Sequence, residues 1–211
     1  MNDLTSILKN NVKSIEKLPP EEQRQILALV EELEEAKTRE EARKSFLPFV
    51  KLMWPSFIHG RHHEIMAEAF ERVAKGELKR LIINMPPRHT KSEFASYLFP
   101  AWFLGMYPEK KVIQTAHTAE LSVGFGRKVR NLIQNEDFQN IFPGIELSTD
   151  SKAAGRWNTN KRGDYFAIGV GGAVTGKGAD ILIIDDPHSE QEATMGEYNP
   201  EVYNKVYEWY T

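Results

Sequence analysis

The first 45 residues of the chain are mostly polar, and the hydrophobic residues among them recur at helical spacing over residues 26–33. The letters PPEE at residues 19–22 open a helix in the favoured way, because proline and acidic residues stabilise a first helical turn. Four apolar residues then follow at helical spacing: Ile26, Leu29, Val30 and Leu33. We therefore predict a helical N-terminal extension over residues 1–45. An aromatic-rich stretch from Phe46 marks the start of a core domain over residues 46–211.

Beyond residue 60 the pattern alternates between the helical period and the strand period. Helices are predicted over residues 62–77 (ended by Gly76), 91–106, 119–134 and 200–211, and strands over 78–85, 110–116, 165–170 and 179–186. Pro100 should kink the helix at 91–106 or divide it in two. Residues 151–164 are predicted to form a polar strand–loop–strand. Because strands alternate with helices, we expect an α/β fold around a mainly parallel sheet flanked by helices.

Composition narrows the class of protein. The chain has 211 residues, 41% of them hydrophobic, with 27 basic and 30 acidic side chains and a net charge of −3. This charge gives no global sign of nucleic-acid binding, so any basic function must be local. The sequence contains no cysteine, which excludes thiolate metal sites and a disulfide scaffold and favours a reducing interior. No apolar run approaches membrane-spanning length, so we expect a soluble intracellular protein.

Residues 81–99 supply the parts of a phosphate-binding loop in the required order. The strand-like letters LIINM lead into the turn PPRHT, and Lys91 and Ser92 open a helix. The N–H groups of such a turn and the helix dipole hold the β-phosphate, the lysine reaches the β- and γ-oxygens, and the hydroxyl binds Mg²⁺. The residues predicted to bind ATP are Pro87, Arg88, His89, Thr90, Lys91 and Ser92.

The loop lacks the glycines of the usual pattern, G-x-x-x-x-G-K-[ST]. Met85 and Thr90 occupy the two glycine positions, and a Cβ at Thr90 would crowd a phosphate that glycine lets approach. Pro86 and Pro87 donate no N–H groups but stiffen the start of the turn. Taken alone, the stretch is explained equally well as a plain strand–turn–helix with an exposed Lys-Ser pair.

Two aspartates end the strand predicted over residues 179–186. Ligands of α/β proteins bind at this edge of the sheet. Asp185 would hold Mg²⁺ through water, opposite Ser92, and Asp186 would orient or deprotonate the attacking water. Two acids before Pro187 can instead form a turn, and that explanation is favoured if the strand is considered alone. The predicted phosphate loop with Lys91, which follows a different predicted strand, favours the functional explanation for the two aspartates.

These motifs together resemble a known family. MPPRHTKSE, a strand followed by QTAH, and then GGAVTGKGADILIIDDPHS are similar to the ATPase domain of tailed-bacteriophage terminase large subunits. Those proteins are motors that pump DNA into a procapsid through its portal. The resemblance runs roughly from Phe46 to the end of the chain. It implies a P-loop NTPase core of the additive-strand type, as in RecA-like and helicase motors. Many relatives have PPRHGKS in the loop, so Thr90 is the local departure.

The resemblance also implies roles for single residues. The implied catalytic residues are Lys91, Arg88, Asp185 and Asp186. Ser92 and Asp185 are the implied Mg²⁺ ligands, and Arg88 is the loop arginine that senses the γ-phosphate. Asp186 stands where the family more often has a catalytic glutamate. Because aspartate is shorter by about one methylene, Glu190 and Glu192 are alternative bases.

The resemblance finally implies an assembly and an activity. The implied partners are double-stranded DNA, a portal protein, a terminase small subunit and further copies in a ring on the portal, with no membrane. The implied location is the host cytoplasm and, transiently, the procapsid portal vertex. A downstream nuclease domain does not fit within 211 residues, so we expect the ATPase domain to be incomplete at its C-terminal end.

The expected activity is Mg²⁺-dependent ATP hydrolysis that powers DNA translocation, without nuclease activity. The alternatives are a non-catalytic nucleotide-binding or assembly module and a helicase-like DNA-dependent ATPase.

Two further polar groups lie near the predicted site in the sequence. His62 and His63 open the helix before the loop, where motors of this kind hold the adenine, and His63 is the predicted contact. A histidine-rich helix start is an equally good explanation. Gln114 and His117 follow the second strand, where DNA-contacting or γ-phosphate-sensing groups occur in motor ATPases. A helix cap by Thr118 is the competing explanation for this segment.

Basic and glycine-rich segments are the remaining candidates. A basic cluster lies on the helix at residues 119–134: Arg127, Lys128 and Arg130. It could follow DNA phosphates, although such clusters are more often solvated faces. Arg156 and Arg162 are candidates to complete a neighbour's active site, or lie at an exposed hairpin tip. Residues 169–180, with Lys177, form either a mobile loop near a ligand or a tight connection.

Overall fold

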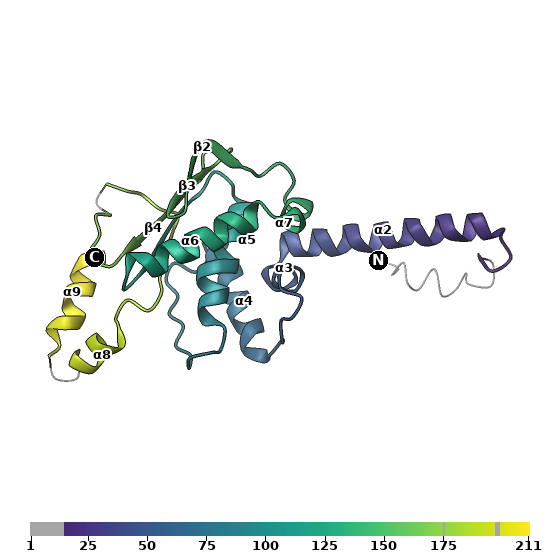
Figure 1. Cartoon of the computed structure of the whole chain (residues 1–211). Helices are drawn as coiled ribbons and strands as arrows, with labels where there is room; N and C mark the ends of the chain where they lie inside the picture. Colours follow the sequence, from purple (N-terminus) through teal and green to yellow (C-terminus); the bar gives the residue numbers. More distant parts are fainter. Residues whose placement is uncertain (1–14, 175, 197–198) are drawn as a thin grey trace.

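The computed structural model describes residues 15–174, 176–196 and 199–211 (Figure 1). The described helices are α2 (Pro20–Lys44), α3 (Phe46–Met53), α4 (Arg61–Ala74), the π-helix η1 (Glu93–Leu98), α5 (Phe99–Met106), α6 (Ala119–Ile133), α7 (Glu136–Ile141), α8 (Glu190–Gly196) and α9 (Glu201–Tyr210). The strands are β1 (Lys111–Ala116), β2 (Leu147–Ala153), β3 (Arg156–Thr159), β4 (Asp164–Gly169) and β5 (Ile181–Ile184).

The five strands form one mixed sheet in the order β2-β3-β4-β1-β5. β1 pairs in parallel with β4 and β5, whereas β2 with β3 and β3 with β4 are antiparallel. The expectation of a P-loop core of the additive-strand type with a mainly parallel sheet is therefore wrong. The reason lies in the connections. Short turns join β2, β3 and β4, and a short turn joins only antiparallel neighbours, whereas parallel pairing requires a long crossover.

The predicted strand at residues 78–85 is also wrong. No strand is assigned there, and β5 ends the sheet on that side. The side chains still alternate, because Leu81 and Ile83 pack against the core while Ile82 is 85% exposed. Alternation of apolar and polar residues along a sequence indicates that every second side chain is buried. A strand additionally needs a hydrogen-bonding neighbour, which hydropathy does not specify.

The other predicted elements are confirmed within the described residues, whereas residues 1–14 of the predicted helical extension lie outside them. The confirmed elements are α2, α4, α6, α9, β1, β4, β5 and the hairpin of β2 and β3. Gly76, with a φ of 74°, follows the end of α4 as predicted. The division at Pro100 is confirmed too, and it takes the form of a π-helical turn. In an α-helix the carbonyl of Ser96 would need the N–H that Pro100 lacks, and the N–H of Phe99 instead bonds five residues back to the carbonyl of Phe94.

Aromatic side chains fill the core between the helices. The ring of Phe46 lies within 5.6–6.4 Å, centroid to centroid, of five others: Phe49, Phe70, Phe94, Phe99 and Trp102. On the sheet side, Tyr165 and Trp157 stack at 4.7 Å under α6. Alternate residues of β4 are buried, so the helices cover one face of this part of the sheet (Figure 1). This packing fixes the helix that follows the predicted phosphate loop.

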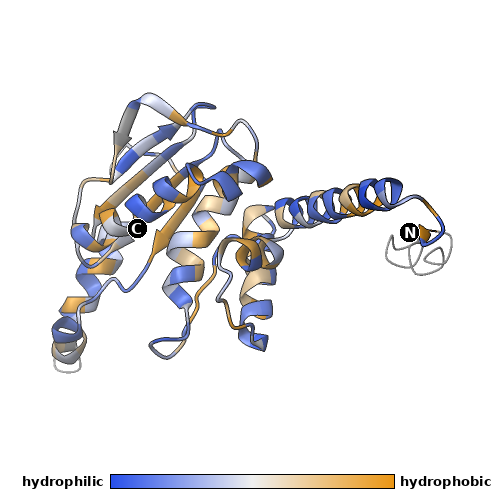
Figure 2. Cartoon of the chain, turned by 45° about the vertical axis from the view of Figure 1, so that its right-hand side comes forward, coloured by the Kyte–Doolittle hydropathy of each residue, from blue (hydrophilic) through white to orange (hydrophobic). Residues whose placement is uncertain are grey.

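Helix α2 extends away from the rest of the molecule (Figures 1 and 2). Its 25 residues span about 37 Å, and Ala42, near its C-terminal end, is its buried residue. Arg43 and Ala42 anchor that end through hydrogen bonds to the carbonyl of Ile141 and from the indole of Trp102. Within the described parts of the chain, no helix has the length and apolar character to cross a membrane.

Candidate functional site

The loop between residues 86 and 90 adopts conformations that glycine usually supplies. Arg88 and Thr90 both have a φ of 64°, in the left-handed region that β-branched residues rarely enter. Asp186, which follows β5, has a φ of 43°. Left-handed backbone at non-glycine residues is energetically unfavourable and tends to gather at functional sites. Here left-handed residues lie on both sides of the contact between Lys91 and Asp186.

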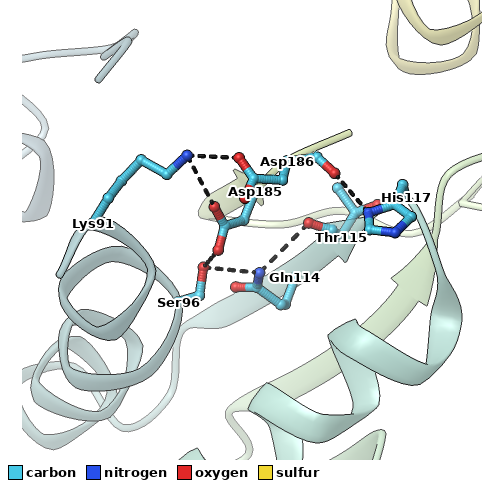
Figure 3. Close-up of polar contacts among 7 residues, drawn as sticks. All are labelled: Lys91, Ser96, Gln114, Thr115, His117, Asp185 and Asp186. Carbon is cyan, nitrogen blue, oxygen red and sulfur yellow. Dashed lines mark hydrogen bonds and ion pairs between the residues drawn. The ribbon is translucent and has the colours of Figure 1, made fainter. Parts of the chain in front are cut away.

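That contact joins Lys91 to the two aspartates after β5 (Figure 3). The Lys91 ammonium lies 2.6 Å from Oδ1 of Asp186 and 3.9 Å from Oδ1 of Asp185. Lys91 begins the helical segment after the loop, so the loop and the end of β5 converge on one cation. Although 94 residues separate Lys91 from Asp185 in sequence, the predicted lysine and acids are neighbours.

Asp185 is held by a buried network (Figure 3). Only 6% of it is exposed, and its Oδ2 accepts a hydrogen bond of 2.8 Å from the hydroxyl of Ser96. Ser96 in turn accepts 3.2 Å from Nε2 of Gln114, and both residues are fully buried. The network links the end of β5 to η1 and β1. It fixes the plane of the Asp185 carboxylate and leaves Oδ1 directed toward Lys91.

Ser96 is the residue that the sequence analysis missed. The hydroxyl bonded to Asp185 belongs to Ser96, whereas Ser92, predicted to bind Mg²⁺ opposite Asp185, lies half-buried about one turn earlier. The available signal was a single polar residue inside the apolar run at 94–99. Its direction could not be read from α-helical spacing, because the turn that presents it is π-helical.

Two predicted polar groups, Gln114 within β1 and His117 just after it, have different surroundings. Gln114 is fully buried, so its side chain is not accessible to DNA in this conformation. His117 lies at the site, since its backbone N–H and its Nδ1 each lie 3.1 Å from the carbonyl oxygen of Asp186. A carbonyl only accepts, so Nδ1 of His117 carries the hydrogen. The competing explanation for Thr118 is confirmed, because its hydroxyl caps α6 at the N–H of Leu121.

His63 contacts the loop itself. Its ring is 3% exposed and packs against Phe57 and Phe94 at 4.6 and 4.9 Å between ring centroids. Nδ1 accepts 3.0 Å from the N–H of Gly60, and Nε2 lies 2.7 Å from the hydroxyl of Thr90. Burial, followed by the neighbouring His62 and His59, lowers the pKa of His63 to about 4, so the ring is neutral near pH 7. This arrangement leaves no ring nitrogen for an adenine base.

The remaining loop residues lie at the surface. Pro87, Arg88 and His89 are exposed, and the carbonyl of Pro87 pairs with Nδ1 of His89 at 2.9 Å. An exposed Arg88 is free to meet a ligand, and its predicted γ-phosphate contact stays a prediction.

Glu192, one of the two alternative bases, has a structural role at the start of α8. It completes a capping box at the start of α8, where the N–H of Ser189 donates 2.8 Å to Glu192 and the Ser189 hydroxyl accepts from the N–H of Glu192. The backbone hydrogen bond from Ser189 is the main reason that the pKa of Glu192 is lowered. A carboxylate with a lowered pKa and a structural role is a poor general base. Glu190 is exposed at the first position of α8.

Two of the basic candidates, Lys128 and Lys177, have structural partners. Lys128 pairs with Glu93 at 2.7 Å and lies 5.4 Å from the ring centroid of Phe125. Lys177 lies 3.6 Å above the ring of Phe166. The described residues of the glycine-rich segment, 170–174 and 176–180, lie between β4 and β5, and a mobile role near a ligand stays a prediction. The predicted trans role of Arg156 and Arg162 stays a prediction.

The acids fit a magnesium ion that is bound together with a substrate. The described residues contain no group of three or more histidine, aspartate or glutamate side chains able to hold a metal by themselves. Mg²⁺ rarely uses such cages, because it keeps several waters and binds through one or two carboxylates plus substrate phosphates. Asp185, with one oxygen held by Ser96 and the other facing the loop, provides such a carboxylate.

Comparisons with known proteins add no relative. No family model, no curated protein and no solved structure matches the chain.

Proposed function

We propose that the chain is a Mg²⁺-dependent ATPase, the motor domain of a phage terminase large subunit. The observation that supports the catalytic part most directly is the convergence of Lys91 on Asp185 and Asp186. A lysine after a tight turn and two carboxylates after a buried strand are the groups that phosphoryl transfer from ATP requires. The carboxylates follow the C-terminal end of a strand, which is the usual ligand edge of parallel neighbours.

Lys91 can exchange Asp186 for a phosphate at little cost. The Asp186 side chain is 63% exposed, and an ion pair with an exposed partner contributes only about 0–1 kcal/mol to stability. The β- and γ-phosphates offer more negative charge than one carboxylate. The ion pair thus keeps the ammonium near the end of β5 until ATP binds.

Asp185 and Ser92 would hold Mg²⁺ through oxygen ligands, and the bound ion would neutralise charge on the phosphate oxygens. The Ser96 hydroxyl keeps Asp185 in one orientation. Asp186 would orient the attacking water once Lys91 has left it. Hydrogen bonds from His117 to the carbonyl oxygen of Asp186 hold the left-handed backbone of Asp186 in position before ATP binds.

A non-catalytic nucleotide-binding or assembly module is the second candidate. It is favoured by the use of Glu192 as a helix cap, which leaves the short Asp186 as the acid next to Asp185. In that case the protein would bind ATP but would not hydrolyse it at a measurable rate.

The assembly part of the proposal rests on the motif likeness. It comprises translocation of double-stranded DNA, a ring of copies on the portal, contacts with portal protein and terminase small subunit, and location in the host cytoplasm and at the portal vertex. The protruding α2 offers a surface for such contacts, since Leu27, Leu29 and Leu33 on it are about half exposed.

Phosphate release from ATP, measured with Mg²⁺ and with a chelator, tests the catalytic part. We expect Asp185→Asn to lower the Mg²⁺-dependent rate by about 100-fold. Asp180→Asn is the matched control, because Asp180 pairs with Lys110 at the opposite end of β5. A wild-type rate in Asp185→Asn would contradict the proposal, and ATP binding without turnover in the wild type would select the module.

A further inference from the structure

Thr90 occupies a backbone conformation that its side chain disfavours. Its φ of 64° lies in the left-handed region, where a Cβ approaches the following carbonyl oxygen. For an ordinary residue this conformation is less populated by a factor of roughly ten, and glycine alone escapes the penalty. The loop pattern has glycine at this position, so something must hold threonine there.

A chain of hydrogen bonds runs through the Thr90 side chain. The N–H of Gly60 donates to Nδ1 of His63, so Nδ1 carries no hydrogen in the neutral ring and Nε2 does. Nε2–H therefore donates 2.7 Å to the hydroxyl oxygen of Thr90. That hydroxyl donates in turn to the carbonyl of His89 at 2.6 Å. Every donor in this chain points toward the loop.

The imidazole at the centre of this chain is itself fixed. Phe57 and Phe94 pack against it, His62 lies 3.8 Å away between ring centroids, and the ring is almost fully buried. Because Gly60 and His63 belong to the start of α4, the hydrogen bonds tie the loop to a helix that is packed in the core. This tie, made of the hydrogen bonds from Gly60 to His63 and from His63 to Thr90, resists rotation of the Thr90 backbone out of its left-handed conformation.

We propose that His63 is a positioning residue that holds the loop in its left-handed form through the Thr90 hydroxyl, so that threonine can stand where the pattern has glycine. The role assigned to the loop, binding the phosphates of ATP, rests on the proposed function, whereas the tie itself does not. Three consequences follow for variants. Thr90→Val keeps the unfavourable backbone and loses the tie, Thr90→Ser keeps both hydrogen bonds, and Thr90→Gly needs no tie.

Tryptic cleavage at the exposed Arg88–His89 bond, without nucleotide, tests the tie. We expect Thr90→Val and His63→Phe each to raise the cleavage rate about five- to tenfold, the effect of losing one hydrogen bond, and Thr90→Ser to restore the wild-type rate. In a Thr90→Gly background, His63→Phe should add nothing. Equal rates in wild type and Thr90→Val, or a full effect of His63→Phe in the Thr90→Gly background, would overturn the proposal.

The ring nitrogens provide a second, independent readout. In ¹⁵N spectra at pH 7, His63 should show a protonated Nε2 and a bare Nδ1, and Thr90→Val should shift Nε2 while leaving the tautomer unchanged. A protonated Nδ1 would overturn the proposal even if a variant failed to fold.

Adding ATP with Mg²⁺ to the cleavage assay separates the two claims. Protection of the wild-type loop supports the phosphate role. If ATP gives no protection while the variant pattern holds, the proposed function fails and the tie stands. If ATP protects the wild type and Thr90→Val equally well and with equal basal cleavage, the tie fails and the proposed function stands.

Discussion

Ser96 and Asp185 form the buried contact that sets the geometry of the candidate site. The hydroxyl supplies the hydrogen bond for a carboxylate oxygen that burial has removed from water. Removing one partner of such a contact leaves the other without compensation, which costs more than the net value of the bond. A short polar side chain in a hydrophobic helix thus matters more to the site than its exposed, charged neighbours.

We predict that Ser96→Ala lowers the free energy of unfolding by about 1–3 kcal/mol. Ser122→Ala is the matched control, because Ser122 is equally buried but its hydroxyl bonds only to the Thr118 carbonyl of its own helix. The control should lose less than about 0.5 kcal/mol. Urea unfolding measures both. If the two variants lost the same stability, Ser96 would have no special role toward Asp185.

His63 makes stability depend on pH in a defined window. Its pKa is lowered from 6.5 to about 4 in the folded protein, chiefly by burial and then by His62 and His59, of which His59 pairs with Glu64. Between these values the unfolded chain binds a proton at His63 that the folded protein does not. The stabilisation is complete above pH 6.5 and is lost as the pH falls toward 4, by up to about 3 kcal/mol.

Urea unfolding of wild type and His63→Gln at several pH values isolates this contribution. The difference in stability between the two proteins should shrink as the pH falls from 7 to 4. A constant difference over that range would show that the folded and unfolded states bind the proton at His63 equally.

At the scale of elements, helix α6 packs against the sheet at β4 and at the β2–β3 turn. The carbonyl of Gly126 in α6 accepts from the indole of Trp157, and a Cβ on Gly126 would lie 2.6 Å from the carbonyl oxygen of Ala154. The neighbouring Gly124 has nothing within 4 Å of such a Cβ. The two glycines of one helix therefore have different reasons to be glycine.

We predict opposite effects for alanine at these positions. Gly126→Ala should lower stability by about 2 kcal/mol or more, because α6 must shift away from the β2–β3 turn. Gly124→Ala should raise stability by about 0.5–1 kcal/mol through helix propensity. Thermal unfolding distinguishes the two, and destabilisation of equal size in both variants would contradict this description of the α6 contact.

Most elements could be predicted from the sequence because their signals are local. The period of α6, the glycine after α4 and the apolar run of β5 each depend on a few neighbouring residues. The sheet could not be predicted, since pairing depends on which connections are long enough to cross over. The strand predicted at residues 78–85 was wrong for the same reason. Its apolar and polar side chains alternate, but no strand of the sheet is assigned as its partner.

At the scale of the whole molecule, the site joins parts of the chain that are remote in sequence. The loop lysine and the acids after β5 could be predicted as neighbours because a lysine loop and an acidic strand end are complementary parts of a phosphate site, although the loop follows an extended segment that is not a strand. Ser96 and the contact of His63 with Thr90 could not, because they depend on a π-helical turn and on the tertiary packing of α4. Packing also fixes the direction of buried polar groups, which hydropathy leaves open.

Binding of ATP to Lys91→Ala, measured by titration calorimetry with Mg²⁺ present, tests the central claim most directly. We predict that the variant binds ATP about 10- to 100-fold more weakly than the wild type, the loss of a charge-assisted contact to phosphate. Lys110→Ala, which removes a similar lysine–aspartate pair of 2.9 Å at the other end of β5, should bind within about twofold of the wild type. Equal affinity of Lys91→Ala and the wild type for ATP would contradict the claim that this loop binds nucleotide.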